Sequence, residues 1–302
     1  MNILVSGLLN TETTVSVRGF PIPYYPIDYP FFGVNTNVSG VGFNLSKALT
    51  TLGDHVRLFS LVGDDFSASY IRHTLEQSGM DSSRVLSALR QSPSSVVLYD
   101  PEGKRQIYCD LKDIQETPYP FSPADLEGID LVVACNINFN RPLLRLAKEA
   151  GKTIATDVHV LSDVHDPYNR EFMEAADIVF LSDEAIGENH GDFLQALADA
   201  YPCRIIVLGR GSKGAAIYQR QDSSIAELPA VSAAPVVNTV GAGDALFSGF
   251  LHFYVQGRTP VESLQLAQIF AAHKIRVSGA SNGFVSELEI ELFAKEHGLC
   301  MY

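Results

Sequence analysis

Cysteine is scarce and scattered in this sequence. There are 4 cysteines in 302 residues, and none of them stand at the spacing of a zinc ligand pair. Their wide separation also gives no disulfide framework of the kind found in small secreted domains. These absences favour a protein that works in a reducing, cytoplasmic environment. The cysteines are Cys109, Cys135, Cys203 and Cys300.

Basic residues are also few. The chain has 22 Lys and Arg against 35 Asp and Glu, which gives a formal net charge of −13 and a pI of about 5.0. An acidic chain is repelled by nucleic acid and by anionic membrane surfaces, so we expect neither as the main partner. A bound nucleotide is still compatible with this charge, because backbone N–H groups and a metal ion can hold phosphates on an acidic protein.

Long apolar segments are absent. No run approaches the roughly 20 residues that a membrane-spanning helix requires. The first seven residues, MNILVSG, lack the charged start and the long apolar stretch of a secretion signal. We interpret them as a first strand and expect no membrane association.

The sequence does contain a regular alternation of short apolar runs and longer helix-like segments, several of which end at a glycine. This alternation predicts an α/β fold with a mostly parallel central sheet and helices on both faces, in a single domain over residues 1–302. The predicted strands are Ile3–Ser6, Val56–Leu61, Leu131–Ala134, Thr153–Thr156, Ile178–Leu181, Ile205–Leu208 and Ala215–Tyr218. The predicted helices include Asn44–Leu52, Phe66–Gln77, Pro142–Ala150 and Ala245–Val255.

Two stretches interrupt the alternation. Residues 13–38 are rich in Pro, Tyr and Phe, and residues 93–115 alternate around a Pro-Glu-Gly turn. We interpret both as strands that project from the main sheet and form a small lid, which would also offer a surface for a homodimer. The alternative is a long surface loop with incidental aromatic residues, although structureless loops of that length are uncommon.

The most informative run is NTVGAGDALFSGF, residues 238–250. Glycines on both sides of Ala242 let the backbone approach a ligand closely, and the free N–H groups of a helix start favour an anion there. A carboxylate beside a bound phosphate, here Asp244, is suited to take a proton from a hydroxyl that attacks phosphorus. The alternative is a tight turn in which Asp244 only caps the helix.

A second glycine cluster, SGVGFN, covers residues 39–44. It lacks the third glycine and the preceding strand of a dinucleotide-binding motif, which argues against nicotinamide binding. The other interpretation is that Gly40, Gly42 and Asn44 line a polyhydroxylated substrate, because an amide both donates and accepts hydrogen bonds.

Acidic and imidazole side chains are dense between Asp157 and Asp166. Asp157, His159, Asp163 and His165 are all types that ligate divalent metals. They fall in one stretch without helical spacing, so a polar loop is the alternative to a dedicated metal site. Arg105, in the second lid stretch, is either an ordinary exposed arginine or a group that reaches an anion on the substrate.

These motifs together resemble the ribokinase-like (PfkB) family of carbohydrate and nucleoside kinases. The resemblance spans nearly the whole chain and is carried, in order, by GLLNTE at 7–12, SGVGFN at 39–44, VGDD at 62–65, VLGRGSKG at 207–214 and NTVGAGD at 238–244. It implies a three-layer ribokinase-like fold with a small β-strand lid. It also implies ATP-dependent phosphotransfer to an alcohol, usually a primary one, on a sugar or a nucleoside.

The resemblance assigns roles by position. Asp244 would be the catalytic base, and the N–H groups of Gly241, Ala242 and Gly243 would hold the transferred phosphoryl group. Mg²⁺ is implied with ATP, and a monovalent cation is a further candidate. The substrate-binding candidates are Asn10, Glu12, Gly40, Gly42, Asn44 and Arg105. The nucleotide-binding candidates are Asp183, Gly209, Gly211, Gly214, Asn238 and Thr239.

Departures from the family pattern leave alternatives open. Glu12 and Asn238 each stand where the family often has Asp, and Ser39 replaces a glycine. The family's Asn-x-x-Glu element, which helps to organise Mg²⁺, reads Ser-Asp-Glu-Ala at 182–185. A non-catalytic sensor of sugars or nucleosides is therefore one alternative. A nucleoside kinase is another, because the aromatic side chains of 13–38 would stack on a base.

Overall fold

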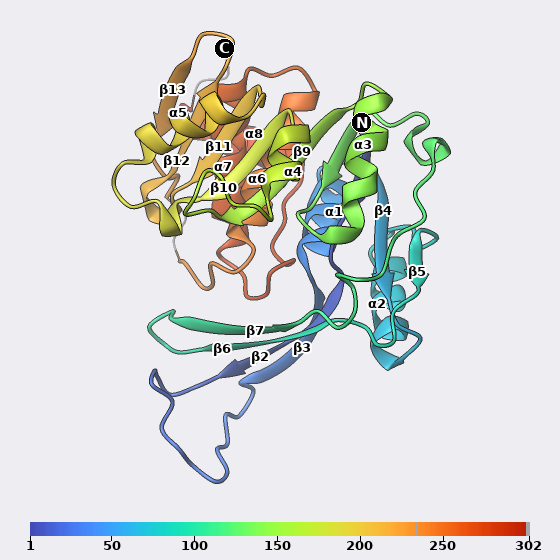
Figure 1. The fold of residues 1–302 in the computed structure, drawn as a ribbon. Coiled ribbons are helices and arrows are strands. Elements are labelled where there is room, and N and C mark those ends of the chain that lie inside the picture. The colour runs from blue at the N-terminus through green and yellow to red at the C-terminus, as the bar shows by residue number, and fades with distance from the viewer. Residues whose placement is uncertain (233–234, 300–302) are drawn as a thin grey trace.

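The computed structural model describes residues 1–232 and 235–299. Within these residues a nine-stranded sheet forms the centre of the molecule (Figure 1). In spatial order the strands are β13 (Ser224–Leu228), β12 (Ala215–Gln219), β11 (Ile205–Gly209), β10 (Ile178–Ser182), β9 (Thr153–Val160), β8 (Leu131–Ala134), β1 (Asn2–Ser6), β4 (His55–Val62) and β5 (Val85–Ser87). Neighbouring strands pair in parallel except at one edge, where β12 runs antiparallel to both β11 and β13.

The central strands are buried on both faces. Every residue of β8 is buried, as are the first four residues of β10 and of β11. Near-continuous apolar runs of this kind are what a parallel sheet covered on both sides requires. All seven strands predicted from the sequence are present. Six of them lie within one residue of their predicted ends, and β9 continues four residues past the predicted Thr156, to Val160.

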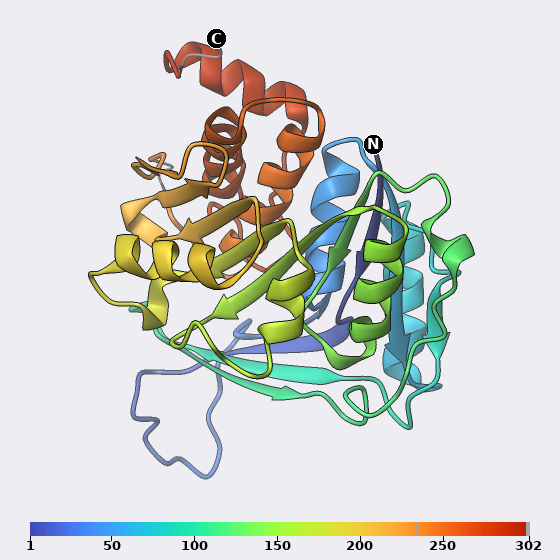
Figure 2. The same cartoon turned by 45° about the horizontal axis from the view of Figure 1, so that its top comes forward.

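Helices cover both faces and complete three layers (Figure 2). The apolar side chains of α3, α4 and α5 pack on one face, and those of α1, α2, α6 and α7 pack on the other, with α8 against α7. The helices are α1 (Val41–Thr51), α2 (Phe66–Gln77), α3 (Arg141–Glu149), α4 (Arg170–Ala175), α5 (His190–Ala200), α6 (Ala242–Val255), α7 (Pro260–Lys274) and α8 (Glu287–Glu296). Short 3₁₀ helices are η1 (Pro123–Leu126), η2 (Asn138–Asn140), η3 (Asp183–Ala185) and η4 (Gly211–Lys213).

The starts of two helices differ from the prediction. Helix α6 begins at Ala242, three residues before the predicted Ala245, and α1 begins at Val41 instead of Asn44. Both extensions follow a glycine with positive φ, Gly241 at 79° and Gly40 at 100°. The prediction rested on the period of the apolar residues alone. It therefore missed the first turn of each helix, which carries Asn44 in α1 and Asp244 in α6.

A separate four-stranded sheet lies beneath the main body (Figure 1). Its strands fall largely within the two stretches predicted as a lid, and the first begins earlier, at Asn10. Residues 17–33 are not strand. They form a long loop, called the excursion below, that extends away from the main body in both views (Figures 1 and 2). In spatial order the strands are β3 (Val34–Ser39), β2 (Asn10–Ser16), β6 (Ser94–Tyr99) and β7 (Arg105–Asp110).

Over the residues that the structure describes, no helix is both long and apolar enough to cross a membrane.

Candidate active site

The candidate site is built where parallel strands end. Strands β9, β10 and β11 are neighbours and run in the same direction, so their carboxyl ends share one edge of the sheet. Ligands of open α/β sheets bind outside that edge. Asp244 lies in the first turn of α6, and the charges of Asp157 and His159 near the end of β9 act on its pKa. The start of α6 therefore lies close to this edge of the sheet.

The start of α6 has the shape of an anion-binding turn. Gly241 adopts a left-handed conformation, and a Cβ there would lie 2.1 Å from the carbonyl oxygen of Ala280. The Ala242 N–H already donates to the Thr239 carbonyl at 3.1 Å. Among the residues described, the N–H groups of Gly241 and Gly243 have no acceptor. In this conformation two of the three expected N–H groups are therefore free for an anion.

Asp244 does not cap α6. Its Oδ2 accepts a 2.7 Å hydrogen bond from Nδ2 of Asn44 on α1, and no side-chain capping bond forms at the helix start. Burial raises the pKa of Asp244 to about 6, against the lowering effect of the Asn44 hydrogen bond. The alternative of a purely structural cap is not supported, and the environment is that of a base tuned close to neutral pH.

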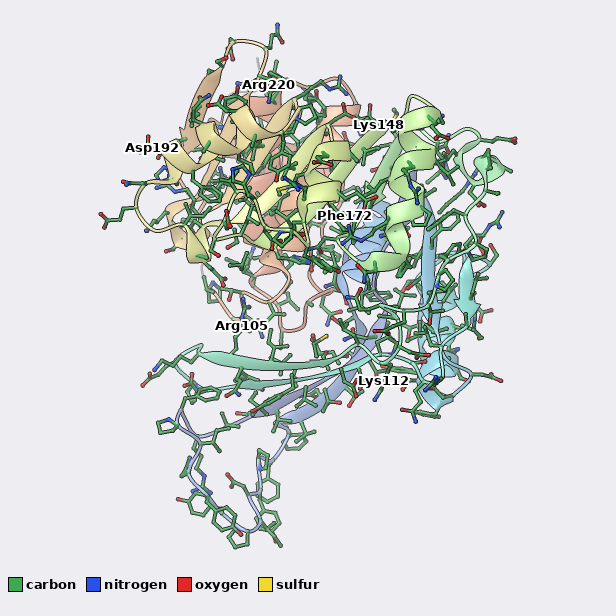
Figure 3. The ribbon with its side chains drawn as sticks, in the orientation of Figure 1. Arg105, Lys112, Lys148, Phe172, Asp192 and Arg220 are labelled. Carbon is green, nitrogen blue, oxygen red and sulfur yellow. The ribbon has the colours of Figure 1, made fainter. Side chains whose placement is uncertain are left out.

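Glu12, on β2, faces the same region from the four-stranded sheet. Ser39 Oγ donates to Glu12 Oε2 at 3.3 Å, and burial raises the pKa of this carboxyl group, opposed by Ser39, Lys274 and Arg105. Arg105 lies on β7, on the side of the four-stranded sheet that faces the main body (Figure 3). Its guanidinium group is 3.9 Å from the carboxylate of Glu184 in the main body. The four-stranded sheet thus contributes both a carboxylate, Glu12, and a guanidinium group, Arg105, to the region below the main body.

Amide groups complete this side of the cluster. Asn10 Nδ2 donates to Ser95 Oγ at 2.9 Å, while the buried oxygens Asn10 Oδ1 and Asn44 Oδ1 have no donor among the residues described. Buried polar atoms normally find a partner, so these oxygens are suited to accept hydrogen bonds from ligand hydroxyls. Gly40 and Gly42 lie at the start of α1, next to Leu8. The Gly42 N–H donates a 3.0 Å hydrogen bond to the Leu8 carbonyl.

The acidic and imidazole stretch is not a metal cluster. No group of three or more His, Cys, Asp or Glu side chains that could hold a metal is found in residues 1–232 and 235–299. His159 instead pairs with Asp157 at 3.2 Å, and this carboxylate raises the pKa of His159 to about 9. The ring of His159 is 45% exposed, and the negative charge of Asp244 also contributes to its raised pKa. The stretch therefore supplies one positive charge at the end of β9.

The predicted nucleotide-binding residues lie along the neighbouring strand ends. Gly209 ends β11, Gly211 opens η4, and Asp183 opens η3 directly after β10. Gly214 also packs tightly, because a Cβ there would lie 2.0 Å from the Leu228 carbonyl oxygen. Asn238 Oδ1 accepts from the Val240 N–H at 2.7 Å and so holds the turn that leads into α6.

One residue of the cluster was missed by sequence reasoning. Lys274, the last residue of α7, is fully buried, and its charge acts on both Asp244 and Glu12. It belongs to none of the motifs above. A lysine at the end of a helix is ordinarily a favourable partner of the helix dipole, so no local pattern distinguishes Lys274 from a common surface lysine.

Comparison with known proteins identifies the family of the chain. Residues 15–287 match the family described as pfkB family carbohydrate kinase. The chain is 24% identical to acarbose 7(IV)-phosphotransferase of Actinoplanes sp., over 94% of this chain and 95% of that protein. It is 25% identical to a nucleoside kinase of Methanocaldococcus jannaschii, over 80% of each chain. The structure of Arabidopsis thaliana ribokinase complexed with ribose and ATP superposes with a TM-score of 0.80 at 20% identity, covering 97% of this chain and 98% of that one.

Proposed function

The chain belongs to the pfkB carbohydrate kinase family, and we propose that it transfers the γ-phosphoryl group of ATP to a primary hydroxyl of a sugar or sugar derivative. The observation that carries the proposal is the position of Asp244. Its carboxylate, with a pKa raised to about 6, stands in the first helical turn beside two free backbone N–H groups. A base and an anion-binding turn at one point are what phosphoryl transfer to an alcohol requires.

The chemistry of the proposed step divides between side chain and backbone. Asp244 takes the proton of the acceptor hydroxyl as its oxygen approaches phosphorus. The N–H groups of Gly241 and Gly243, with the dipole of α6, stabilise the charge on the transferred group. Asn44 holds the carboxylate in one orientation and keeps it ionised at neutral pH through its 2.7 Å hydrogen bond.

ATP and Mg²⁺ fit the residues present. The free N–H groups at the start of α6 suit the terminal phosphate, and we propose that the nucleoside lies beside Gly211 at the start of η4, where a Cβ would meet nothing within 4 Å. Mg²⁺ is usually held by one or two carboxylates together with substrate phosphates, and neutralises phosphate charge when bound. Asp183 is the carboxylate that we propose for it, because the neighbouring Glu184 is paired with Arg105.

The acceptor side favours a sugar over a nucleoside. Glu12 and the unpaired oxygens of Asn10 and Asn44 all accept hydrogen bonds, which suits a ligand rich in hydroxyls. Stacking of a base on the aromatic segment is not supported, because residues 17–33 lie on the far side of the four-stranded sheet from the main body (Figures 1 and 2). A nucleoside kinase remains the second candidate, since one similar protein is a nucleoside kinase.

The experiment is a panel assay of ADP release. Purified protein is incubated with Mg²⁺ and ATP and each of a set of sugars, sugar derivatives and nucleosides, and the variant D244N is run in parallel. We expect turnover with a sugar that falls by about 10²–10⁴-fold in D244N. D192N, an exposed surface change on α5, is the matched control. Ligand binding without turnover across the panel would favour a sensor, and undiminished turnover by D244N would remove Asp244 as the base.

We also propose that the four-stranded sheet and its excursion form a homodimer surface. Large apolar side chains are exposed along residues 17–33, which is uncommon on a monomeric protein. Light scattering of the wild type should give a dimer mass, and the double variant F31S/F32S should give a monomer. The most exposed members are Tyr24, Ile27, Tyr29, Phe31 and Phe32.

A further inference from the structure

Lys274 is a buried cation without a hydrogen-bond partner. Its side chain is fully shielded from solvent, and Nζ has no acceptor among the residues described. Asp244 from α6 and Glu12 from β2 both act on its charge, yet neither is close enough to form an ion pair. Glu289 from α8 acts on the charge of the neighbouring His273 and is not among the groups that act on Lys274.

An isolated ammonium in this position does not serve the fold. Removal of the charge from water is unfavourable unless the group is paired or hydrogen-bonded, and desolvation accordingly lowers the pKa of Lys274 to about 8. The side chain does not cap the carbonyl groups at the end of α7 either, since Nζ makes no hydrogen bond within residues 1–232 and 235–299. An anion that enters between Asp244 and Glu12 would supply the partner that the protein itself does not provide.

Resting on the proposed kinase function, we propose that Lys274 is a catalytic residue that binds the phosphoryl group as it reaches the acceptor oxygen. The free N–H groups of Gly241 and Gly243 hold this group at the start of α6, and the ammonium of Lys274 holds it from the end of α7. The backbone of α7 is fixed beside that turn, because the Ile275 carbonyl accepts from the N–H groups of Val237 and Asn238 at 2.9 and 3.1 Å.

The step balances without any further reactant. A lone pair of the acceptor oxygen forms the new bond to the γ-phosphorus, and the bond from that phosphorus to the β,γ-bridging oxygen breaks, with its electron pair leaving on ADP. The acceptor proton passes to Asp244. Lys274 exchanges no proton and contributes only its charge, which attracts the phosphoryl oxygens on the acceptor side.

The first test uses binding alone. Thermal melting is followed with Mg²⁺ and ADP, and then with aluminium fluoride added as a mimic of the transferred phosphoryl group. For the wild type we expect a shift with ADP and a further shift with the fluoride. K274M should keep the ADP shift and lose the further one, whereas K47M, which changes a half-buried lysine on α1 that faces neither carboxylate, should keep both.

The melting temperature of K274M without ligand shows whether Lys274 has a catalytic or a structural role. If Lys274 is held unpaired for the reaction, K274M removes an unfavourable buried charge and should melt at the same temperature as the wild type or higher. A structural lysine would instead show a loss of several degrees. A fall in melting temperature, or a fluoride shift in K274M equal to that of the wild type, would overturn the proposal.

Kinetics with the acceptor found in the panel provide the second test. We expect kcat of K274M to fall about 100-fold, as when one donor to a transition-state oxyanion is removed, with the KM for ATP little changed. The wild type should lose kcat/KM as pH rises through about 8, where the free ammonium deprotonates, and K274M should lack this decline. Turnover of K274M within threefold of the wild type would contradict the proposal. The absence of any ADP shift in the wild type would instead reject the kinase function.

Discussion

Asn44 on α1 donates a 2.7 Å hydrogen bond to Asp244 on α6, although the two residues are 200 positions apart in the chain. The bond joins the first turns of two helices that each follow a glycine with positive φ. It fixes one carboxylate oxygen, Oδ2, and leaves Oδ1 without a donor among the residues described. Asp244 is thereby oriented and kept partly ionised, with one oxygen available to a substrate hydroxyl.

The first prediction concerns the acid side of the pH profile. The pKa of Asp244 is raised to about 6, and only the ionised carboxylate can accept a proton, so kcat/KM should fall as pH drops through about 6. In N44A the hydrogen bond that lowers this pKa is absent, and the decline should begin up to about one pH unit higher. Profiles from pH 4.5 to 8 measure this, with N35A on β3 as a control. An unchanged acid limb in N44A would show that Asn44 does not tune the base.

The second prediction concerns stability. The folded-state pKa of Asp244 lies above its ordinary value of 3.8, so the fold favours the protonated form and loses stability as pH rises from about 4 to 6. D244N removes this penalty, and at pH 7.5 it should melt about 2 °C or more above the wild type. Partial exposure keeps the gain well below the roughly 3 kcal/mol that a two-unit shift represents.

The same comparison at pH 4 provides the check on this explanation. Asp244 is then protonated in the folded wild type, so the advantage of D244N should vanish. An advantage that persists at pH 4 would point to a packing effect and not to the charge. D192N, an exposed change on α5, should match the wild type at both pH values.

The third prediction compares two glycines of the α6 turn. A Cβ at Gly241 would lie 2.1 Å from the Ala280 carbonyl oxygen, and its φ of 79° is unfavourable for alanine. G241A should therefore lose about 2 kcal/mol or more in urea unfolding. A Cβ at Gly243 meets nothing within 4 Å, so G243A should be at least as stable as the wild type. G243A should nevertheless turn over more slowly, because its methyl group occupies the space beside the free N–H groups.

The fourth prediction concerns the contact between the two sheets. Arg105 of β7 and Glu184 of the main body are 3.9 Å apart and are 37% and 64% exposed, so the pair contributes little stability. R105A should leave the melting temperature unchanged. Because Arg105 also faces Glu12, R105A should raise the KM for the acceptor about 10-fold. K104A, its exposed neighbour, should not, and an unaltered KM in R105A would remove Arg105 from the acceptor site.

Much of the fold could be predicted because its signals are local. Helix α2 matches its predicted limits, Phe66–Gln77, because Asp65 caps its start and Gly79 follows its end. The family motifs likewise identified Asp244 and the glycines beside it. The lid was predicted only in outline, since residues 17–33 carry strand-like aromatics but do not pair with a neighbouring strand. Pairing of strands is decided by partners far along the chain, which local composition does not specify.

The alternation of strands and helices, the family, and the carboxylate that we propose as the base could all be identified from the sequence, because periodicity, glycine turns and motif order are properties of neighbouring residues. Which distant groups surround that carboxylate depends on the folded arrangement of the chain. It brought Asn44, His159 and Lys274 to Asp244 from three other elements, and it buried the Lys274 ammonium where no group of the described chain accepts a hydrogen bond from it. Electrostatics acts through space, so the pKa of a carboxylate and the role of a lysine become evident only once the chain has folded.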